Sequence, residues 1–181
     1  MLMTSTTLNM SMMKNSPQLL SYDIAPGVRA FSTMRHGGVG EGAYCSFNIN
    51  SYCGDSQENI AANKASLAET LGIEPTKILL PHQVHGADFC IIAPDFMALS
   101  EEERAKVIEG VDGIFTSMSG VCIGVSTADC IPIIIYDPEH HAACAIHAGW
   151  RGTVKRIASK AVAEMQTTHH SNADKLKAVK G

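Results

Sequence analysis

Apolar residues recur at helical spacing in two stretches of the chain, and a third stretch has the capping residues of a helix. The first stretch begins near Asp55, which forms a capping-box-like pair with Glu58, and Gly72 marks its end. The second places apolar residues on one side of a helix over residues 153–165. The third, residues 100–109, opens with a serine and three glutamates, whose charges suit the positive end of a helix dipole. The pattern therefore predicts three helices.

Short apolar runs between turn residues predict the strands. In the second half of the chain these runs are almost continuously apolar, which is typical of strands buried on both faces. The predicted strands are residues 19–24, 28–33, 77–80, 88–93, 112–116, 121–126, 131–136, 142–147 and 176–180. Because strands and helices are interspersed, the predicted fold class is α/β, with mixed sheets and helices outside them.

The composition fits one globular domain and narrows the classes of partner. Of the 181 residues, 45% are hydrophobic and 18% are charged, which is enough apolar material to fill a core. Residues 1–16 are rich in Met, Ser, Thr and Asn and lack periodicity, so we expect a loose tail before a single domain over residues 17–181. The net charge of −4, without a stripe of Lys or Arg, argues against nucleic acid as a partner.

The chain carries no sequence signal for a membrane or for export. No apolar run approaches the ~18 residues of a membrane span, and the first residues lack the charged and apolar regions of a secretory signal. We therefore expect a cytoplasmic protein without a membrane partner, whose six cysteines are reduced thiols. Three of them, Cys90, Cys122 and Cys144, lie within apolar runs and are interpreted as small core residues.

Reactive side chains concentrate where predicted strands meet loops, the place where open α/β sheets put their sites. Three such segments supply His85, Cys130 and His147. Two imidazoles and a thiol from separate loops, with a fourth position open, form the donor set of a catalytic zinc site, and Cu²⁺ would compete for it. On spacing alone, His85 and His147 would more often be structural histidines than metal ligands, so both interpretations stay open.

Other polar residues in these loops are candidates for binding or catalysis. Arg35 and Arg151 lie in glycine-rich loops, where a guanidinium can grip a phosphate or carboxylate, or form a surface salt bridge. Asp129 precedes Cys130, and this polar pair interrupts two buried runs. Trp150, the only tryptophan, is interpreted as a core or lid anchor.

At these residues the sequence resembles the YfiH-type laccase-domain family, also called peptidoglycan editing factor or multicopper polyphenol oxidase-like proteins. The matching strings occur in the family's order and are STMRHGG at 32–38, SFN at 46–48, GD at 54–55, HQVHG at 82–86, DG at 112–113, TADCIP at 127–132 and HAGWRG at 147–152. The resemblance covers the chain from about residue 20 onward. Met34 departs from the family, which usually has a small hydroxyl residue there. The family also continues past the position of Gly181, so the resemblance implies a domain lacking its C-terminal part.

The resemblance implies a layered α/β sandwich and a metal-dependent enzyme of purine nucleosides. It implies that His85, Cys130 and His147 bind Zn²⁺, with Cu²⁺ as the other metal linked to the family. The implied reactions are phosphorolysis of adenosine, inosine, guanosine or methylthioadenosine, and deamination of adenosine. The implied partners are thus a purine nucleoside and phosphate, while the oligomeric state stays open.

Secondary roles follow as hypotheses for this reaction. Cys130 would serve the reaction as a metal ligand, Arg35 and Arg151 would offset phosphate charge, and Asp129 would orient a ligand or transfer a proton. Hydrogen bonds to the sugar or base would come from Asn48, His82 and Gln83.

Three rival functions use the same residues differently. Cys130 as a nucleophile with His147 as its base would make a cysteine hydrolase of amides or esters. A copper-dependent phenol oxidase is less favoured, because the sequence lacks the His-x-His pairs of a multicopper cluster. A structural metal clip in an interaction protein is the non-enzymatic alternative.

Overall fold

The structure is a computed structural model that describes residues 16–181. Residues 1–15 of the predicted tail lie outside the described residues. The chain divides into two compact units. The smaller contains the described residues up to Ser21 and Phe31–Ile78, and the larger contains Tyr22–Ala30 and Leu79–Gly181. The expectation of a single domain over residues 17–181 stays a prediction.

The smaller unit is organised around one long helix. Helix α2, Gln57–Leu71, begins at Ser56, whose hydroxyl accepts a hydrogen bond from the Asn59 N–H, and ends at Gly72 in the left-handed conformation. The sequence placed the cap one residue too early, at Asp55. The Asp55 carboxylate instead accepts from the side-chain amide of Asn48 (2.9 Å) and from the backbone N–H of Ser56 (2.7 Å).

A buried asparagine of α2 holds the glycine-rich loop of the same unit. Asn63 is 1% exposed, and its carbonyl oxygen accepts from the Val39 N–H at 2.9 Å. Its amide donates to the carbonyls of Ser46 and Asn48. The other elements before residue 78 are the strands β1 (Leu19–Tyr22) and β2 (Ala30–Thr33), which pair with each other, and the 3-10 helices η1 (Gly42–Tyr44) and η2 (Pro75–Lys77).

The larger unit is built on a mixed five-stranded sheet in the order β4-β5-β8-β7-β9. Strand β4 runs parallel to β5, and the other neighbours are antiparallel. Its strands are β4 (Phe89–Ile92), β5 (Gly113–Thr116), β7 (Ile131–Asp137), β8 (Ala142–Ala148) and β9 (Lys177–Lys180). A separate pair joins β3 (Ile78–Leu79) and β6 (Cys122–Ile123).

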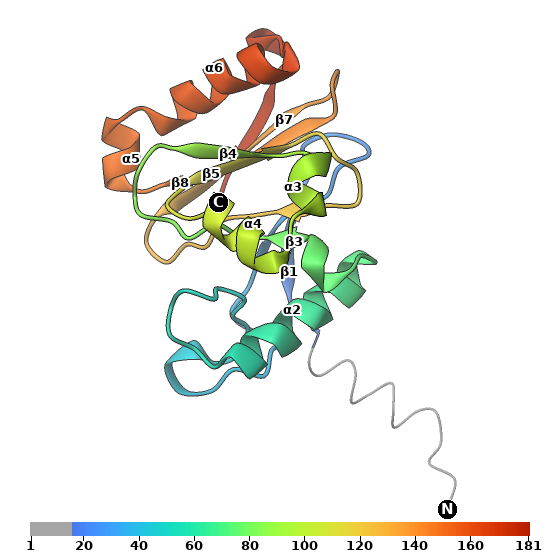
Figure 1. The fold of residues 1–181 in the computed structure, drawn as a ribbon, viewed down its shortest axis with the longest axis vertical. Helices are drawn as coiled ribbons and strands as arrows, with labels where there is room; N and C mark the ends of the chain where they lie inside the picture. The colour runs from blue at the N-terminus through green and yellow to red at the C-terminus, as the bar shows by residue number, and fades with distance from the viewer. Residues whose placement is uncertain (1–15) are drawn as a thin grey trace, which may run out of the picture. The chain divides into compact units, whose positions relative to one another are not determined.

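Helices cover both faces of this sheet (Figure 1). On one face, α6 packs Ile157 and Met165 against a cluster that includes Phe115 of β5. On the other face, Phe96 of α3 packs with Ile114, the residue that precedes Phe115 in the same strand. All four residues of β5 are buried because alternate side chains enter opposite clusters. The helices are α3 (Pro94–Ala98), α4 (Glu101–Val107), α5 (Trp150–Val154) and α6 (Ile157–His169), followed by the 3-10 turn η3 (Ala173–Lys175).

The predicted mixed α/β fold with outer helices is confirmed, and two local expectations are corrected. The helix expected over residues 153–165 is broken at Arg156, whose φ of 59° ends α5 before α6 begins. The strand expected over residues 121–126 shortens to two residues, β6. The helix expected to begin at Ser100 does so, with a capping box between Ser100 and Glu103, and Cys144 is fully buried as expected. Among residues 16–181 we find no helix with the length and apolar character that a membrane crossing requires.

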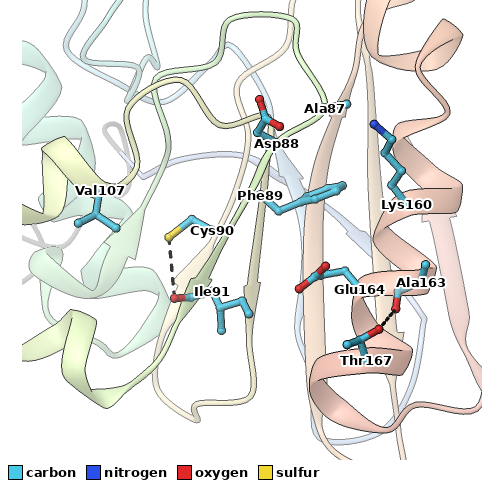
Figure 2. A pocket seen from close by; sticks show the side chains of 10 residues that line it. All are labelled: Ala87, Asp88, Phe89, Cys90, Ile91, Val107, Lys160, Ala163, Glu164 and Thr167. Atoms are coloured by element: carbon cyan, nitrogen blue, oxygen red, sulfur yellow. Dashed lines mark hydrogen bonds between the residues drawn. The ribbon is translucent and has the colours of Figure 1, made fainter.

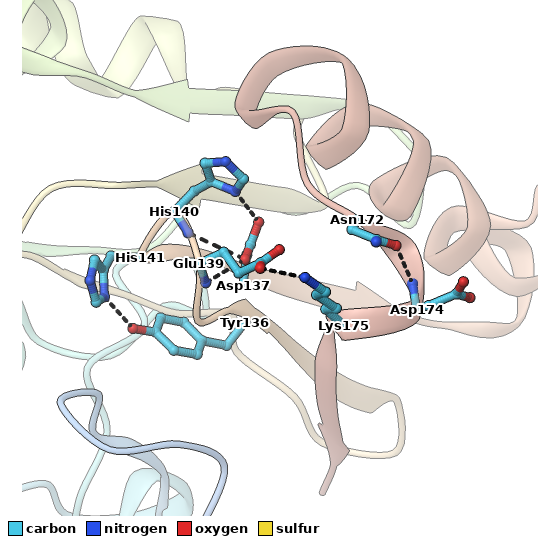
Figure 3. A network of polar contacts seen from close by, with 8 residues as sticks. All are labelled: Tyr136, Asp137, Glu139, His140, His141, Asn172, Asp174 and Lys175. Atoms are coloured by element: carbon cyan, nitrogen blue, oxygen red, sulfur yellow. Dashed lines mark hydrogen bonds and ion pairs between the residues drawn. The ribbon is translucent and has the colours of Figure 1, made fainter.

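A polar network closes the turn between β7 and β8 (Figure 3). Asp137, 1% exposed, accepts from the backbone N–H groups of Glu139 and His140 and pairs with the His140 ring at 2.8 Å. Burial raises the pKa of Asp137, but hydrogen bonds from Ser171, His140 and the turn backbone outweigh it and lower the pKa to about 2. His140 and His141 are both exposed, and their rings contact Asp137 and Tyr136.

Candidate metal centre

Three side chains from separate segments of the larger unit converge at one end of its sheet. His85 lies in the loop before β4, Cys130 immediately precedes β7, and His147 lies within β8. Their ligand atoms, two imidazole nitrogens and one sulfur, all lie within 4.8 Å of one another. The His85 and His147 rings meet edge to face, with centroids 4.7 Å apart. The structure thus brings together the three residues that the sequence singled out as a donor set.

Sheet register explains why Cys130 and His147 meet. Strands β7 and β8 are antiparallel neighbours, and Pro132 pairs with His147 in the ladder. Cys130 lies two residues before Pro132, so its side chain emerges at the same end of the sheet. His147 is 3% exposed, Cys130 is half-buried and His85 is exposed. The cluster is therefore anchored in the sheet and open on the side of His85.

A buried carboxylate that was not among the predicted site residues holds the cluster together. Asp112, which precedes β5, is fully buried, and its Oδ1 lies 2.7 Å from Nδ1 of His147. The same carboxylate accepts from the backbone N–H groups of Val84 (3.2 Å), His85 (3.0 Å) and Gly86 (2.6 Å). The signal in the sequence was a carboxylate at the start of a buried strand, but Asp112 was interpreted only as that strand boundary and as part of the DG string of the resemblance.

Glycine at position 149 leaves the space beside the donor atoms open. A Cβ atom there would lie 3.0 Å from the Cys130 sulfur and 3.1 Å from Cδ2 of His85. A second glycine, Gly152, allows the start of α5 to approach the 84–86 loop, because a Cβ there would lie 2.9 Å from the Gly86 carbonyl oxygen. A side chain at either glycine of the HAGWRG string would therefore collide with atoms at or beside this cluster.

The donor set suits a divalent cation of the zinc type. Zn²⁺ in catalytic sites takes three protein ligands of imidazole, thiolate or carboxylate type and keeps a fourth position for water or substrate. Histidine ligands ordinarily donate their other ring N–H to a carboxylate or carbonyl, and Nδ1 of His147 lies 2.7 Å from the Asp112 carboxylate. Among residues 16–181 this is the one group of three or more such side chains with metal-ligand proximity.

The other predicted residues of the larger unit have partners of their own or face solvent. The side-chain amide of Gln83 donates to the carbonyl of Ser126 at 2.8 Å and accepts from its N–H at 2.7 Å. His82 pairs with Glu109 at 2.6 Å. Asp129 is exposed beside Cys130. Gln83 therefore ties the loop of His85 to the segment that leads into Cys130, and its role in substrate binding stays a prediction.

Trp150 and Arg151 begin α5 directly after Gly149. Trp150 is 69% exposed, so its interpretation as a core residue is wrong, and the lid interpretation stays a prediction. The Arg151 guanidinium lies 5.0 Å from the centre of the Trp150 ring, in a cation–π contact.

Two predicted residues, Arg35 and Asn48, belong to the smaller unit. Arg35 donates to the carbonyl of Cys45 at 3.3 Å, and three hydrogen bonds from Ser46 and Phe47 reach its own carbonyl. Asn48 donates to Asp55 and to the sulfur of Cys53. Their roles toward phosphate and nucleoside stay predictions.

A separate groove of about 670 Å³ lies along the edge strand β4 and helix α6 (Figure 2). Phe89 and Ile91 of β4 line it together with Lys160 and Glu164 of α6. Cys90 also lines it, and burial raises the pKa of this thiol, which makes it a poor nucleophile. None of the three residues of the metal cluster lines this groove.

Comparison with known proteins places the chain in a family. The family model described as multi-copper polyphenol oxidoreductase laccase matches residues 29–181. The chain belongs to this family. The resemblance found in the sequence is thereby confirmed.

Relatives of the family carry names of purine nucleoside enzymes. A purine nucleoside phosphorylase of Bacteroides thetaiotaomicron is 39% identical over 136 residues, which are 75% of this chain and 50% of the relative. Adenosine deaminase RL5, from an unknown prokaryotic organism, is 39% identical over 155 residues, 86% of this chain and 59% of the relative. The chain thus spans about half the length of the curated relatives it matches.

Solved structures share the fold. The crystal structure of YlmD from Geobacillus stearothermophilus matches with a TM-score of 0.79 at 32% identity, covering 87% of this chain and 59% of that one. The Bacillus licheniformis protein YfiH matches with a TM-score of 0.81 at 24% identity, over 92% of this chain and 62% of that one, which shows the common fold.

Proposed function

We propose that this chain carries the metal centre of a zinc-dependent purine nucleoside phosphorylase that also deaminates adenosine. The observation that carries the proposal is the convergence of His85, Cys130 and His147 in one open cluster. Relatives of this family named purine nucleoside phosphorylase and adenosine deaminase supply the substrate class. Adenosine, inosine, guanosine and methylthioadenosine are the proposed nucleosides, with phosphate as the second substrate.

The proposed ligands would hold zinc so that its open position faces reactants. Bound there, the metal would supply a Lewis acid for an anionic phosphate or for water. In phosphorolysis a phosphate oxygen bonds to the anomeric carbon while the bond from that carbon to the purine nitrogen breaks. The purine keeps the electron pair and takes up a proton. Cys130 and His147 would hold the metal, and the exposed His85 would complete the donor set.

The remaining residues are proposed to bind substrate and move protons. Arg151 and Arg35 would offset phosphate charge through their guanidinium groups. Asp129, exposed beside the cluster's cysteine, would transfer a proton when water replaces the 6-amino group and ammonia leaves. His82, Gln83 and Asn48 are proposed contacts for the sugar or base.

The decisive experiment replaces the thiolate ligand and measures metal before activity. We expect Cys130→Ala to lose bound zinc, measured by elemental analysis, and to lose phosphate-dependent cleavage of adenosine. Cys90→Ala is the matched control, because it removes a thiol of the same unit outside the cluster. Unchanged zinc content and phosphorolysis in Cys130→Ala would reject the proposal.

A cysteine hydrolase is the second candidate, and one observation favours it. His147 lies between Cys130 and Asp112, the order of nucleophile, base and orienting carboxylate in a catalytic triad. Alkylation of metal-free protein with iodoacetamide separates the two functions. If zinc protects Cys130 from alkylation, the thiol is a metal ligand; if the thiol reacts in a fast phase that zinc leaves unchanged, the hydrolase is favoured.

A further inference from the structure

We propose that Asp112 is the positioning residue of the metal centre, setting the geometry of both histidine ligands through one buried carboxylate. The inference rests on the proposed metal centre and concerns how the chain builds it. Asp112 is fully buried, and its carboxylate contacts the His147 ring and the backbone N–H of His85.

The first contact fixes which nitrogen of His147 is free to bind a metal. The Asp112 carboxylate already accepts hydrogen bonds from backbone N–H groups, which can only donate, so its oxygens act as acceptors. Nδ1 of His147, 2.7 Å from Oδ1, is therefore the donor. A neutral imidazole that donates from Nδ1 keeps its lone pair on Nε2, which is the nitrogen left for a metal.

The second set of contacts shapes the backbone that carries His85. Three successive N–H groups, those of Val84, His85 and Gly86, point at the one carboxylate. Successive N–H groups converge in this way only when the chain is sharply turned. His85 has a φ of 61°, a left-handed conformation that a residue with a side chain adopts at a cost. Asp112 therefore stabilises the turn that places the His85 ring beside His147.

Sheet register places Asp112 between the two histidines. In the antiparallel pair of β5 and β8, Gly113 is opposite Ile146, so Asp112 and His147 are the next residues at that end. The Asp112 carbonyl accepts from the His147 N–H at 2.8 Å, which fixes the main chain as well as the ring. One residue thus links β5, β8 and the loop of His85.

The experiment measures metal binding rather than turnover. Zn²⁺ affinity and the visible spectrum of the Co²⁺-loaded chain would be compared for the wild type, Asp112→Asn and Asp88→Asn. An asparagine cannot accept at both positions, so either His147 or the 84–86 turn loses its acceptor. We expect the Zn²⁺ dissociation constant of Asp112→Asn to rise by about 10- to 100-fold, with an altered Co²⁺ spectrum. Asp88→Asn removes an exposed carboxylate nearby and should behave like the wild type.

The outcomes distinguish a failure of the proposed metal centre from a failure of the positioning role of Asp112. If the wild type binds neither metal, the proposed metal centre fails, and the role of Asp112 fails with it. If the wild type binds and folded Asp112→Asn binds with the same affinity and the same Co²⁺ spectrum, the metal centre stands and the positioning role is overturned.

A second measurement covers the case in which Asp112→Asn does not fold. Long-range ¹H–¹⁵N correlation in the wild type reports which ring nitrogen of His147 carries the proton. We expect the proton on Nδ1 in the zinc-bound protein. A proton on Nε2 in the zinc-bound protein would overturn the inference.

Discussion

At the residue scale, the cluster depends on the missing side chain of Gly149 as much as on the donor atoms beside it. The position has no side chain, and three cluster atoms lie within 4 Å of where a Cβ would stand. Those atoms belong to Cys130, His85 and His147, so any larger residue would compete with the metal for the same space. Steric access to donors from three segments is therefore set by Gly149, two residues after His147.

Gly149→Ala should weaken metal binding without unfolding the chain. The added methyl would lie 3.0 Å from the Cys130 sulfur and 3.1 Å from the His85 ring, which forces one donor to move. Because donors must hold their positions closely, we expect the Zn²⁺ dissociation constant to rise by roughly 10-fold or more, measured by competition with a chelating dye.

Gly124→Ala is the matched control for this substitution. A Cβ at Gly124 would meet no atom within 4 Å, so the same change should leave zinc affinity as it is. Equal affinity in Gly149→Ala and Gly124→Ala would contradict the placement of Gly149 against the donors.

At the element scale, apolar pattern predicted the sheet but not every boundary. The run over residues 112–116 was recognisable as a buried strand because both its faces are covered. The break at Arg156 was not predictable, since no glycine or proline marks that left-handed residue. Asp112 was missed for a related reason: its partners lie 26 to 35 residues away, and spacing along the chain does not record such contacts.

The turn between β7 and β8 supplies an element-scale prediction about pH. The pKa of Asp137 is lowered from 3.8 to about 2 in the folded chain, so the folded state favours the charged carboxylate. That stabilisation is fully present above the unfolded value and is lost as pH falls through the folded value. We expect Asp137→Asn to lower the unfolding free energy by about 2 kcal/mol at pH 7 and by much less near pH 2.

Urea unfolding of both proteins at several pH values measures this difference. Asparagine can still accept from the turn backbone, so the comparison isolates the charge of Asp137 and its pairing with His140. If the difference in unfolding free energy between the two proteins stays constant from pH 5 to pH 2, the lowered pKa of Asp137 is contradicted.

At the scale of the whole molecule, the proposed zinc ligands belong to one of the two compact units. His85, Cys130 and His147 all lie in the larger unit, while α2 lies in the smaller. A bound cation would join three segments of the larger unit, namely the 84–86 loop, the start of β7 and the end of β8. Its effect on stability should therefore be confined to that unit.

Zinc removal followed by hydrogen exchange tests this expectation. A ligand that binds only the folded state stabilises it by about 2.7 kcal/mol at a free concentration 100 times its dissociation constant. We expect zinc to slow amide exchange in β7, β8 and the 84–86 loop, and to leave α2 unchanged. In Cys130→Ala the same zinc concentration should not slow amide exchange in β7, β8 and the 84–86 loop, nor in α2. If zinc slows exchange in α2 to the same degree as in β8, the metal acts on the chain as a whole. That result would place its binding outside the cluster of two histidines and a cysteine.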